Sequence, residues 1–185
     1  MNATATITAV VPTGTWKTDA VHSSVGFAVK HLGVSTVRGQ FTDFDGTLEV
    51  DENGSASAHG TVQAASVDTR EPQRDEHLRS PDFFDAAQFP ELKFRSTSIT
   101  PSGEDTFEIA GDLTIHGVTR EIVLDAELTG SDVDTQGNTR VGLEITGELS
   151  RKDYGMTFNA ALGSGNLVVS DKVKLALDIS AVKQA

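Results

Sequence analysis

The stretch Phe107–Leu128, FEIAGDLTIHGVTREIVLDAEL, contains two runs of alternating apolar and polar residues joined by a tight connection at His116-Gly117-Val118-Thr119. A period of two is typical of a β-strand with one buried face. A short connection that contains glycine favours an antiparallel hairpin. The apolar face of the pair carries Phe107, Ile109, Leu113, Ile115, Ile122, Leu124, Ala126 and Leu128.

The same alternation recurs on both sides of this hairpin and predicts about eight to ten strands. The polar faces carry charged residues, which indicates that they meet water: Glu121, Asp125, Glu127, Arg140, Glu144, Glu148, Lys172, Lys174 and Asp178. An outer-membrane barrel would reverse this pattern. Only 5 prolines are present to protect strand edges, so we expect the sheet to close. The predicted fold is all-β, an antiparallel barrel that is soluble.

The alternation stops once, between Ser66 and Pro90. Thr69 is suited to cap a helix, and Ser80 followed by Pro81 suits a second helix start. We therefore expect one or two short helices inserted around residues 70–85. Phe83 and Phe84 in this segment are too apolar for a disordered loop, and we interpret the segment either as a lid over an apolar opening or as a purely structural cap.

Composition limits the function further. The formal net charge is -12, which opposes binding to nucleic acids and to anionic membrane surfaces. Without cysteine the chain has no thiol chemistry. The 5 histidines show no spacing typical of a zinc site, and no GxSxG nucleophile motif occurs. We expect no metal, and a Ser-His-Asp arrangement that would use Asp75 and His77 has no specific support.

We expect residues 1–14 to form a loose N-terminal arm and residues 15–185 to form a single barrel domain. The N-terminus has no positively charged region and no long apolar run, and no segment has the length of a membrane-spanning helix. The sequence therefore predicts a cytoplasmic protein without an integral membrane segment. A homodimer through exposed strands or through the arm stays an open alternative.

Several inward positions carry very small side chains, namely Ala56, Ala58, Gly60, Ala64, Gly111, Ala126 and Gly147. A barrel of about eight strands holds a small ligand only when its inward residues leave room. With 6% aromatic residues, large partners for these positions are scarce. We infer an elongated apolar tunnel; the alternative is tight closure, with glycines relieving strain at bends.

Motifs in nearly the whole chain, from about Thr15 to Ile179, resemble the YceI-like family. Besides the single residues Trp16, Asp19, Gly33, Val34 and Val37, they are VHSSVGFAVKH (21–31), GQFTDFDG (39–46), SVDT (66–69), RDEHLRSPDFFD (74–85), FPELKF (89–94), GDLTIHGVTR (111–120) and SRKDYG (150–155). The resemblance implies an extended lipocalin-like barrel that binds a polyisoprenoid, an isoprenoid quinone or a fatty-acid derivative. Many members carry a signal peptide and are periplasmic, and the short uncharged N-terminus here differs from them.

The expected ligand tunnel combines inward strand positions with the aromatic residues of the insertion: Phe27, Val29, His31, Phe41, Ala58, Gly60, Val62, Phe83, Phe84, Phe94, Ile109, Leu113, Leu124, Ile145 and Leu175. Candidates for binding the polar head group are Arg70, Arg74, His77 and Arg79. Arginine binds carboxylates and phosphates in a bidentate manner. The alternative for Arg74 and Arg79 is an ion pair with Asp75, Glu76 or Asp82.

We therefore predict a non-enzymatic protein that binds a long-chain amphiphile for storage, transport or sensing. Its only bound cofactor would be the isoprenoid lipid or quinone itself. Two alternatives are an enzyme acting on an apolar substrate and a β-rich interaction module with a solid core. If the tunnel exists, Gly60→Phe should fill it, reduce ligand binding and leave the fold soluble.

Overall fold

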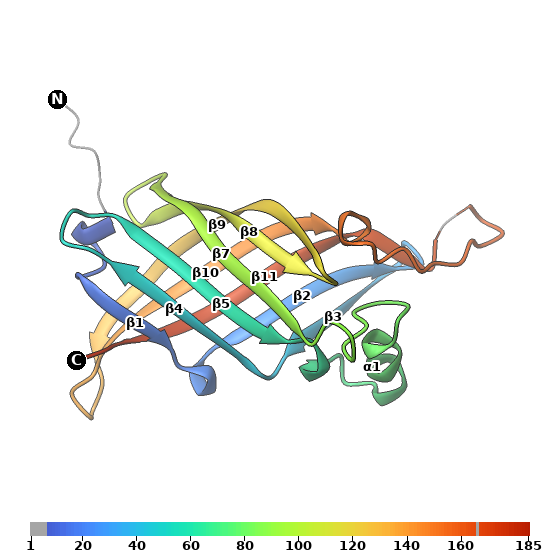
Figure 1. Ribbon diagram of the computed structural model, residues 1–185, viewed down its shortest axis with the longest axis horizontal. Helices are drawn as coiled ribbons and strands as arrows, with labels where there is room; N and C mark the ends of the chain where they lie inside the picture. The colour runs from blue at the N-terminus through green and yellow to red at the C-terminus, as the bar shows by residue number, and fades with distance from the viewer. Residues whose placement is uncertain (1–6, 166) are drawn as a thin grey trace.

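The computed structural model describes residues 7–165 and 167–185. Within them, one 11-stranded antiparallel sheet has the order β1-β4-β5-β7-β8-β9-β10-β11-β2-β3-β6 (Figure 1). The strands are β1 (Gly14–Thr18), β2 (Ser24–His31), β3 (Ser35–Phe41), β4 (Phe44–Val50), β5 (Ala56–Gln63), β6 (Val67–Asp68), β7 (Glu91–Pro101), β8 (Thr106–Ile115), β9 (Val118–Val133), β10 (Thr139–Ser150) and β11 (Val169–Lys183). In these residues, no helix is long and apolar enough to cross a membrane.

A pairing between β1 and β11 closes the sheet into a barrel. Trp16 pairs with Lys183, Lys17 with Val182 and Thr18 with Ala181. The closed ring is β1-β4-β5-β7-β8-β9-β10-β11, and these eight strands form the predicted all-β antiparallel barrel. Further along, β11 pairs with β2 instead of β1. Strands β1 and β2 therefore act as one interrupted strand alongside β11, and the barrel is elongated (Figure 1).

The predicted hairpin is formed by β8 and β9. Ile115 pairs with Val118, and the two residues between them, His116 and Gly117, both have positive φ values, 53° and 72°. Positive φ at both central positions is the property of a type I′ turn, whose twist matches that of the strands. His116 Nδ1 lies 3.1 Å from the carbonyl oxygen of Tyr154, so the turn also contacts the chain after β10.

The insertion contains one α-helix, α1 (Pro72–Arg79), where one or two were expected. Glu71, not Thr69, caps it by accepting a hydrogen bond from Gln73 N at 3.1 Å. The second helix expected at Ser80 and Pro81 is absent, because the chain there forms turns. Leu78 and Phe84 pack against a core cluster that contains Phe41, Val67 and Leu92.

Helix α1 lies where the sheet has an edge. Strand β6 pairs with β3 through Gln40–Asp68 and Phe41–Val67, and in the described residues it has no second partner strand. Figure 1 shows α1 and the turns after it beside this edge, at one end of the barrel. We call this end the α1 end and the opposite end, where β1 meets the C-terminal residues of β11, the β1 end.

The described part of the N-terminal arm is packed rather than loose, while residues 1–6 of the predicted arm lie outside the described residues. Ile7–Ala9 form a 3-10 helix, and the side chains of Ile7 and Val11 belong to a core cluster with Trp16. Val11 and Trp16 are both 0% exposed. The Trp16 indole N–H donates to Pro12 O at 3.0 Å, which fixes the segment over the interior. This segment closes the β1 end.

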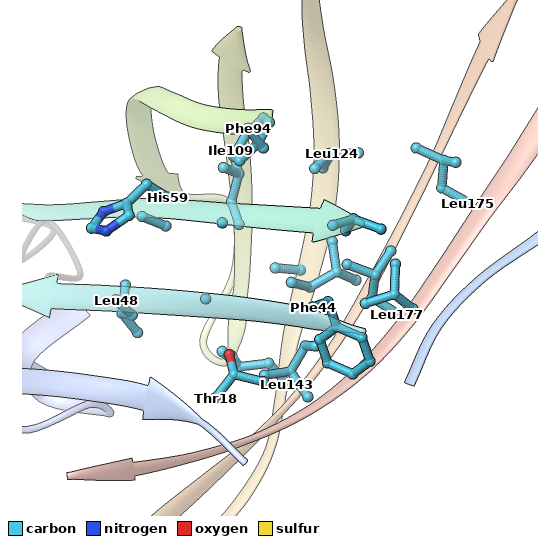
Figure 2. A pocket seen from close by; sticks show the side chains of 18 of the residues that line it. Thr18, Phe44, Leu48, His59, Phe94, Ile109, Leu124, Leu143, Leu175 and Leu177 are labelled. Atoms are coloured by element: carbon cyan, nitrogen blue, oxygen red, sulfur yellow. The ribbon is translucent and has the colours of Figure 1, made fainter. Parts of the chain in front are cut away.

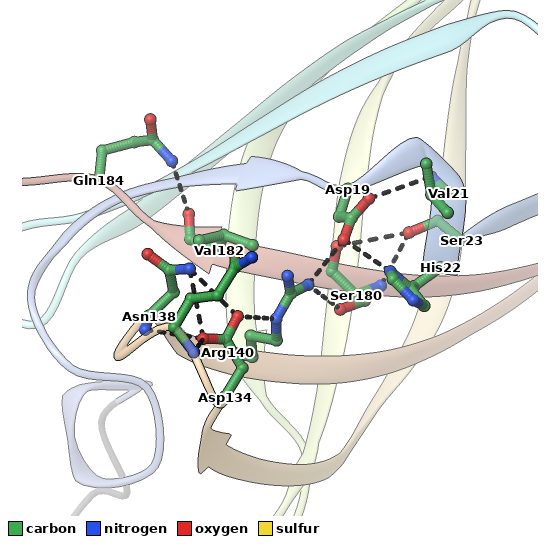
Figure 3. A network of polar contacts seen from close by, with 11 residues as sticks. Asp19, Val21, His22, Ser23, Asp134, Asn138, Arg140, Ser180, Val182 and Gln184 are labelled. Carbon is green, nitrogen blue, oxygen red and sulfur yellow. Dashed lines mark hydrogen bonds and ion pairs between the residues drawn. The ribbon is translucent and has the colours of Figure 1, made fainter.

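Arg140 of β10 ties several elements together near the β1 end (Figure 3). Its Nη1 donates to Asp19 at 2.7 Å, and its Nε donates to Asp134 at 2.7 Å. Hydrogen bonds from His22 and Arg140 lower the pKa of Asp19 to about 2. The backbone N–H of Asn138 and the Arg140 guanidinium also lower the pKa of Asp134. Both carboxyl groups are therefore ionised at neutral pH.

Arg140→Gln should lower the melting temperature at pH 7. Because the folded-state pKa values of Asp19 and Asp134 lie below their unfolded values, this stabilisation is present above about pH 4 and is lost as the pH falls towards 2. Thermal denaturation of both proteins, followed by circular dichroism between pH 7 and pH 2.5, should show the difference shrinking. A difference that is constant over this range would contradict the assignment.

Candidate functional site

The inside of the closed ring contains a cavity of about 250 Å³. Side chains from all eight strands of the ring line it, and Figure 2 shows them converging from opposite walls. The lining is overwhelmingly aliphatic and aromatic, for example Leu48, Ile109, Leu124 and Leu177. Where Gly46 faces Gly60 across β4 and β5, backbone atoms border the cavity directly. We call this cavity the inner chamber.

A second cavity, of about 340 Å³, lies under α1 at the α1 end, and we call it the outer chamber. Its wall comes from β2, β3, α1, the turns after α1, and the loop between β10 and β11. The two chambers share part of their lining, so they adjoin. The shared residues are Phe27, Phe41, Leu92, Ile115, Leu149 and Leu175. The interior is thus elongated and apolar from the closed β1 end to the α1 end.

All the residues expected to line a tunnel do border these chambers. The inner chamber has Ala58, Gly60, Val62, Phe94, Ile109, Leu113, Leu124 and Ile145; the outer chamber has Val29, His31, Phe83 and Phe84; Phe27, Phe41 and Leu175 border both. That these residues contact a ligand stays a prediction.

Neighbouring aromatic rings fill part of the space that the small inward residues leave. A Cβ atom on Gly39 would lie 2.4 Å from the Phe27 ring, and one on Gly111 would lie 2.4 Å from the Phe94 ring. These glycines therefore provide space for the rings themselves and do not simply widen the interior. This packing explains why the interior consists of two chambers of moderate volume, each near or below the lower limit for typical ligand pockets.

The four head-group candidates lie in different environments. Arg74 and His77 line the outer chamber, whereas Arg70 and Arg79 do not. Arg79 donates to the carbonyl oxygens of Ala65 at 2.8 Å and Val67 at 3.2 Å, so it fastens α1 to β6. Arg70 has a φ of 63° and is exposed.

Arg74 is held by Thr69 and not by an acidic residue. Its Nε donates to Thr69 Oγ1 at 2.7 Å, and its Nη2 donates to Thr69 O at 3.0 Å. Within the described residues its Nη1 has no protein acceptor. Thr69 in turn donates its hydroxyl to the buried carboxylate of Asp75 at 2.6 Å. The ion pairs considered for Arg74 and Arg79 with Asp75, Glu76 or Asp82 are not formed in the structure.

His77 lies at the rim of the outer chamber. Its Nε2 is 2.8 Å from Asp82 Oδ2, and its ring meets those of Phe83 and Phe158 edge-on, with centroids 5.0 Å and 4.9 Å away. Asp75, two residues before it, bonds to Thr69 instead. The Asp75–His77 pair considered for catalysis is therefore not assembled.

Sequence reasoning missed Arg151, which borders the outer chamber and is 3% exposed. Burial lowers the pKa of its guanidinium, whose nearest carboxylate, Asp171, is 3.5 Å away. Its other acceptors are the carbonyl oxygens of Met156 at 2.8 Å, Phe158 at 2.9 Å, Ser170 at 2.9 Å and Val169 at 3.3 Å. Arg151 thus holds the loop between β10 and β11 over the chamber. The only signal was its place in SRKDYG (150–155), because the carbonyl acceptors have no sequence signature.

Residues 16–181 match the model of the YceI-like domain, so the chain belongs to the YceI-like family. Protein YceI of Escherichia coli is 39% identical over 165 residues, which cover 88% of this chain and 83% of that protein. The match to the family model spans most of the ring, α1 and the loop after β10, and so includes most of the residues that line the two chambers.

Solved structures show the same architecture. The YCEI protein of Campylobacter jejuni is 28% identical with a TM-score of 0.73, and the match covers 100% of both chains. A polyisoprenoid binding domain from Saccharophagus degradans is 16% identical with a TM-score of 0.65, and the match covers 91% of this chain and 98% of that one. This second similarity concerns the fold alone.

Arg151→Met should destabilise the protein by about 3 kcal/mol, because it leaves several buried carbonyl groups without a donor. Lys152→Met is the matched control, since the neighbouring Lys152 side chain is 50% exposed and pairs with the same Asp171; it should cost less than about 1 kcal/mol. Urea denaturation measures both. Equal losses in the two variants would show that Arg151 does not hold the loop.

Proposed function

We propose that this protein binds a long-chain amphiphile, namely a polyisoprenoid, an isoprenoid quinone or a fatty-acid derivative, inside the barrel. The observation that carries the proposal is the pair of adjoining, mainly apolar chambers, which are closed at the β1 end and have Arg74, His77 and Arg151 in the lining of the outer chamber at the α1 end. A chain-like ligand fits such an interior better than a compact one. The polyisoprenoid binding domain with the same fold supports this class of ligand.

The apolar tail supplies the binding free energy. Each methylene group moved from water into an apolar environment contributes about 0.8 kcal/mol. The inner chamber has few polar groups that a tail would have to desolvate, and its wall is closed by backbone hydrogen bonds all round. Entry from the β1 end is blocked by Ile7, Val11 and Trp16, so the tail enters from the α1 end and points towards Trp16.

The polar head then stays in the outer chamber, near Arg74 and His77. The free Nη1 of Arg74 offers two N–H donors to a carbonyl, carboxylate or phosphate oxygen. His77 and the exposed His31 border the same chamber. Storage, transport and sensing all use this arrangement, and the proposal covers binding itself.

We infer binding without catalysis from the hydrogen bonds and the exposure of the polar groups around the outer chamber. Arg74 and Arg151 are used in hydrogen bonds that hold the backbone, and the carboxylate beside His77 belongs to Asp82, whose side chain is 51% exposed. General acid–base catalysis needs a group placed against a reacting atom. Here the polar groups lie at the rim while the apolar chamber receives the tail.

Gly60→Phe is a poor test of this proposal, contrary to the expectation from sequence. A Cβ atom on Gly60 would lie 2.9 Å from the backbone oxygen of Asp45 on the paired strand. The substitution would therefore disturb the pairing of β4 and β5 as well as fill the chamber. Ala58, two residues earlier, already has a side chain that lines the inner chamber.

Ala58→Phe should weaken binding of a fluorescent prenyl or acyl probe by about tenfold, because the ring displaces about two methylene groups at ~0.8 kcal/mol each. Ser57→Phe is the control, since Ser57 is exposed on the outer face of the same strand. Fluorescence titration measures both affinities. Unchanged probe affinity in Ala58→Phe, with the variant folded by circular dichroism, would contradict ligand binding in the inner chamber.

A further inference from the structure

Two loops at the α1 end lie side by side and contain no charged residue. They are residues 32–37, which form the loop after β2 and the start of β3, and residues 154–165 and 167–170, which form the loop after β10 and the start of β11; we call them the uncharged tip. In the whole chain 23% of residues are charged, yet none is charged from Tyr154 to Ser170. Leu32 N donates to Val168 O at 3.0 Å, which joins the loops. Figure 1 shows the second loop extending past the barrel beside β2 and β3.

The uncharged tip exposes large apolar side chains to water. Val34 is 81% exposed, Leu167 40% and Phe158 37%. Single exposed apolar residues are common on proteins, but a group of them on adjoining loops indicates a contact surface. The buried Arg151 holds the base of the second loop in place. The apolar side chains are therefore exposed on a loop whose base is fixed.

Basic residues stand directly behind the tip. Lys30 of β2, Arg38 of β3 and Lys174 of β11 are exposed. Arg38 and Lys174 both pair with Ala28 across neighbouring strands, so they lie in one row on the outer face. Within the described residues none of the three has an ion-pair partner.

Three acidic side chains on the strands around this row already have partners. Asp171 pairs with Lys152 at 3.0 Å, and Glu148 pairs with Lys172 at 3.2 Å. The Asp68 carboxylate accepts the backbone N–H of Arg70 at 2.8 Å. This end of the barrel therefore presents an apolar, uncharged projection backed by unpaired positive charge, although the whole chain carries -12.

The tip is also the rim of the outer chamber. Val37, Phe158 and Val168 belong to the tip and also line the chamber, and so do Lys30 and His31, which directly precede the tip. A surface that touched the tip would meet the opening through which we propose that the ligand passes.

We propose that the uncharged tip docks on an anionic lipid bilayer, so that a lipid moves between the bilayer and the outer chamber without crossing water. The inference rests on the proposed function. Exposed Val, Leu and Phe side chains enter the interfacial region of a bilayer, and the basic row contacts anionic head groups. The net charge does not prevent this, because charges farther away than about 8–10 Å are screened at physiological salt.

Vesicle flotation tests the docking step, with vesicles of phosphatidylcholine alone and of phosphatidylcholine mixed with phosphatidylglycerol. The wild type should bind the mixed vesicles in a salt-sensitive manner. Val34→Asp combined with Leu167→Asp should reduce this binding at least about tenfold, and each of Lys30→Ser and Arg38→Ser should reduce it about fivefold.

The matched control is Val21→Asp combined with Val133→Asp. These residues are 85% and 58% exposed and lie outside the tip, so the control removes similar apolar surface and adds the same charge. Its vesicle binding should stay within about twofold of the wild type. A loss equal to that of the tip variant would show that total charge decides the binding and would overturn the proposal.

Transfer of a fluorescent prenyl probe separates docking from ligand binding. For the wild type and the control, the transfer rate to mixed vesicles should rise with vesicle concentration, as expected for transfer by contact; for the tip variant it should become independent of vesicle concentration. The wild type, the tip variant, Arg38→Ser and the control, none of which changes a residue that lines a chamber, should take up the probe from dilute solution with equal affinity.

Two failures are distinguishable. No probe uptake by any variant would contradict the proposed function itself. Probe uptake by the wild type without vesicle binding would overturn lipid docking and would leave the tip as a surface for a protein partner.

Discussion

The closed barrel depends on the short antiparallel pairing between β1 and β11. Three residue pairs close the ring, and each of its eight strands then has a partner strand on both sides. A closed ring has no exposed strand edge and only one inside. Because β11 continues past β1 to pair with β2, the same strand also extends the wall to the α1 end. Closure and elongation therefore have one cause, the length of β11.

The two ends of this interior differ, because one end is closed and the other is partly open. At the β1 end, Val11 and Trp16 are fully buried and fill the ring. At the α1 end the sheet has an edge beside β6, and α1 covers it through Arg79 and Leu78. The cavity is therefore closed at the β1 end and opens only at the α1 end. The basic row and the uncharged tip then stand at that entrance.

The sequence predicted those features that depend on local patterns. Alternation with a period of two identified the strands and their inward residues. The tetrapeptide His116–Thr119 located the connection between β8 and β9, of which only His116 and Gly117 form the turn. The role of Val11 could not be predicted, because its burial comes from contacts with strands distant in sequence. The roles of Arg79 and Arg151 were missed for a similar reason: their acceptors are backbone carbonyls, which every residue has. Thr69 was assigned as a helix cap, but it bonds to Asp75 instead, and Glu71, which directly precedes the first helical residue Pro72, is the cap.

The central claim is that the two chambers hold a chain-like lipid. The most direct measurement is solvent extraction of the freshly purified protein with mass spectrometry of the extract, beside native mass spectrometry of the intact protein. We expect one bound molecule per chain, with a repeating isoprene unit or a long acyl chain, which extraction removes and added ligand restores. A protein that is empty as purified and takes up neither quinone, prenyl alcohol nor fatty acid would contradict it.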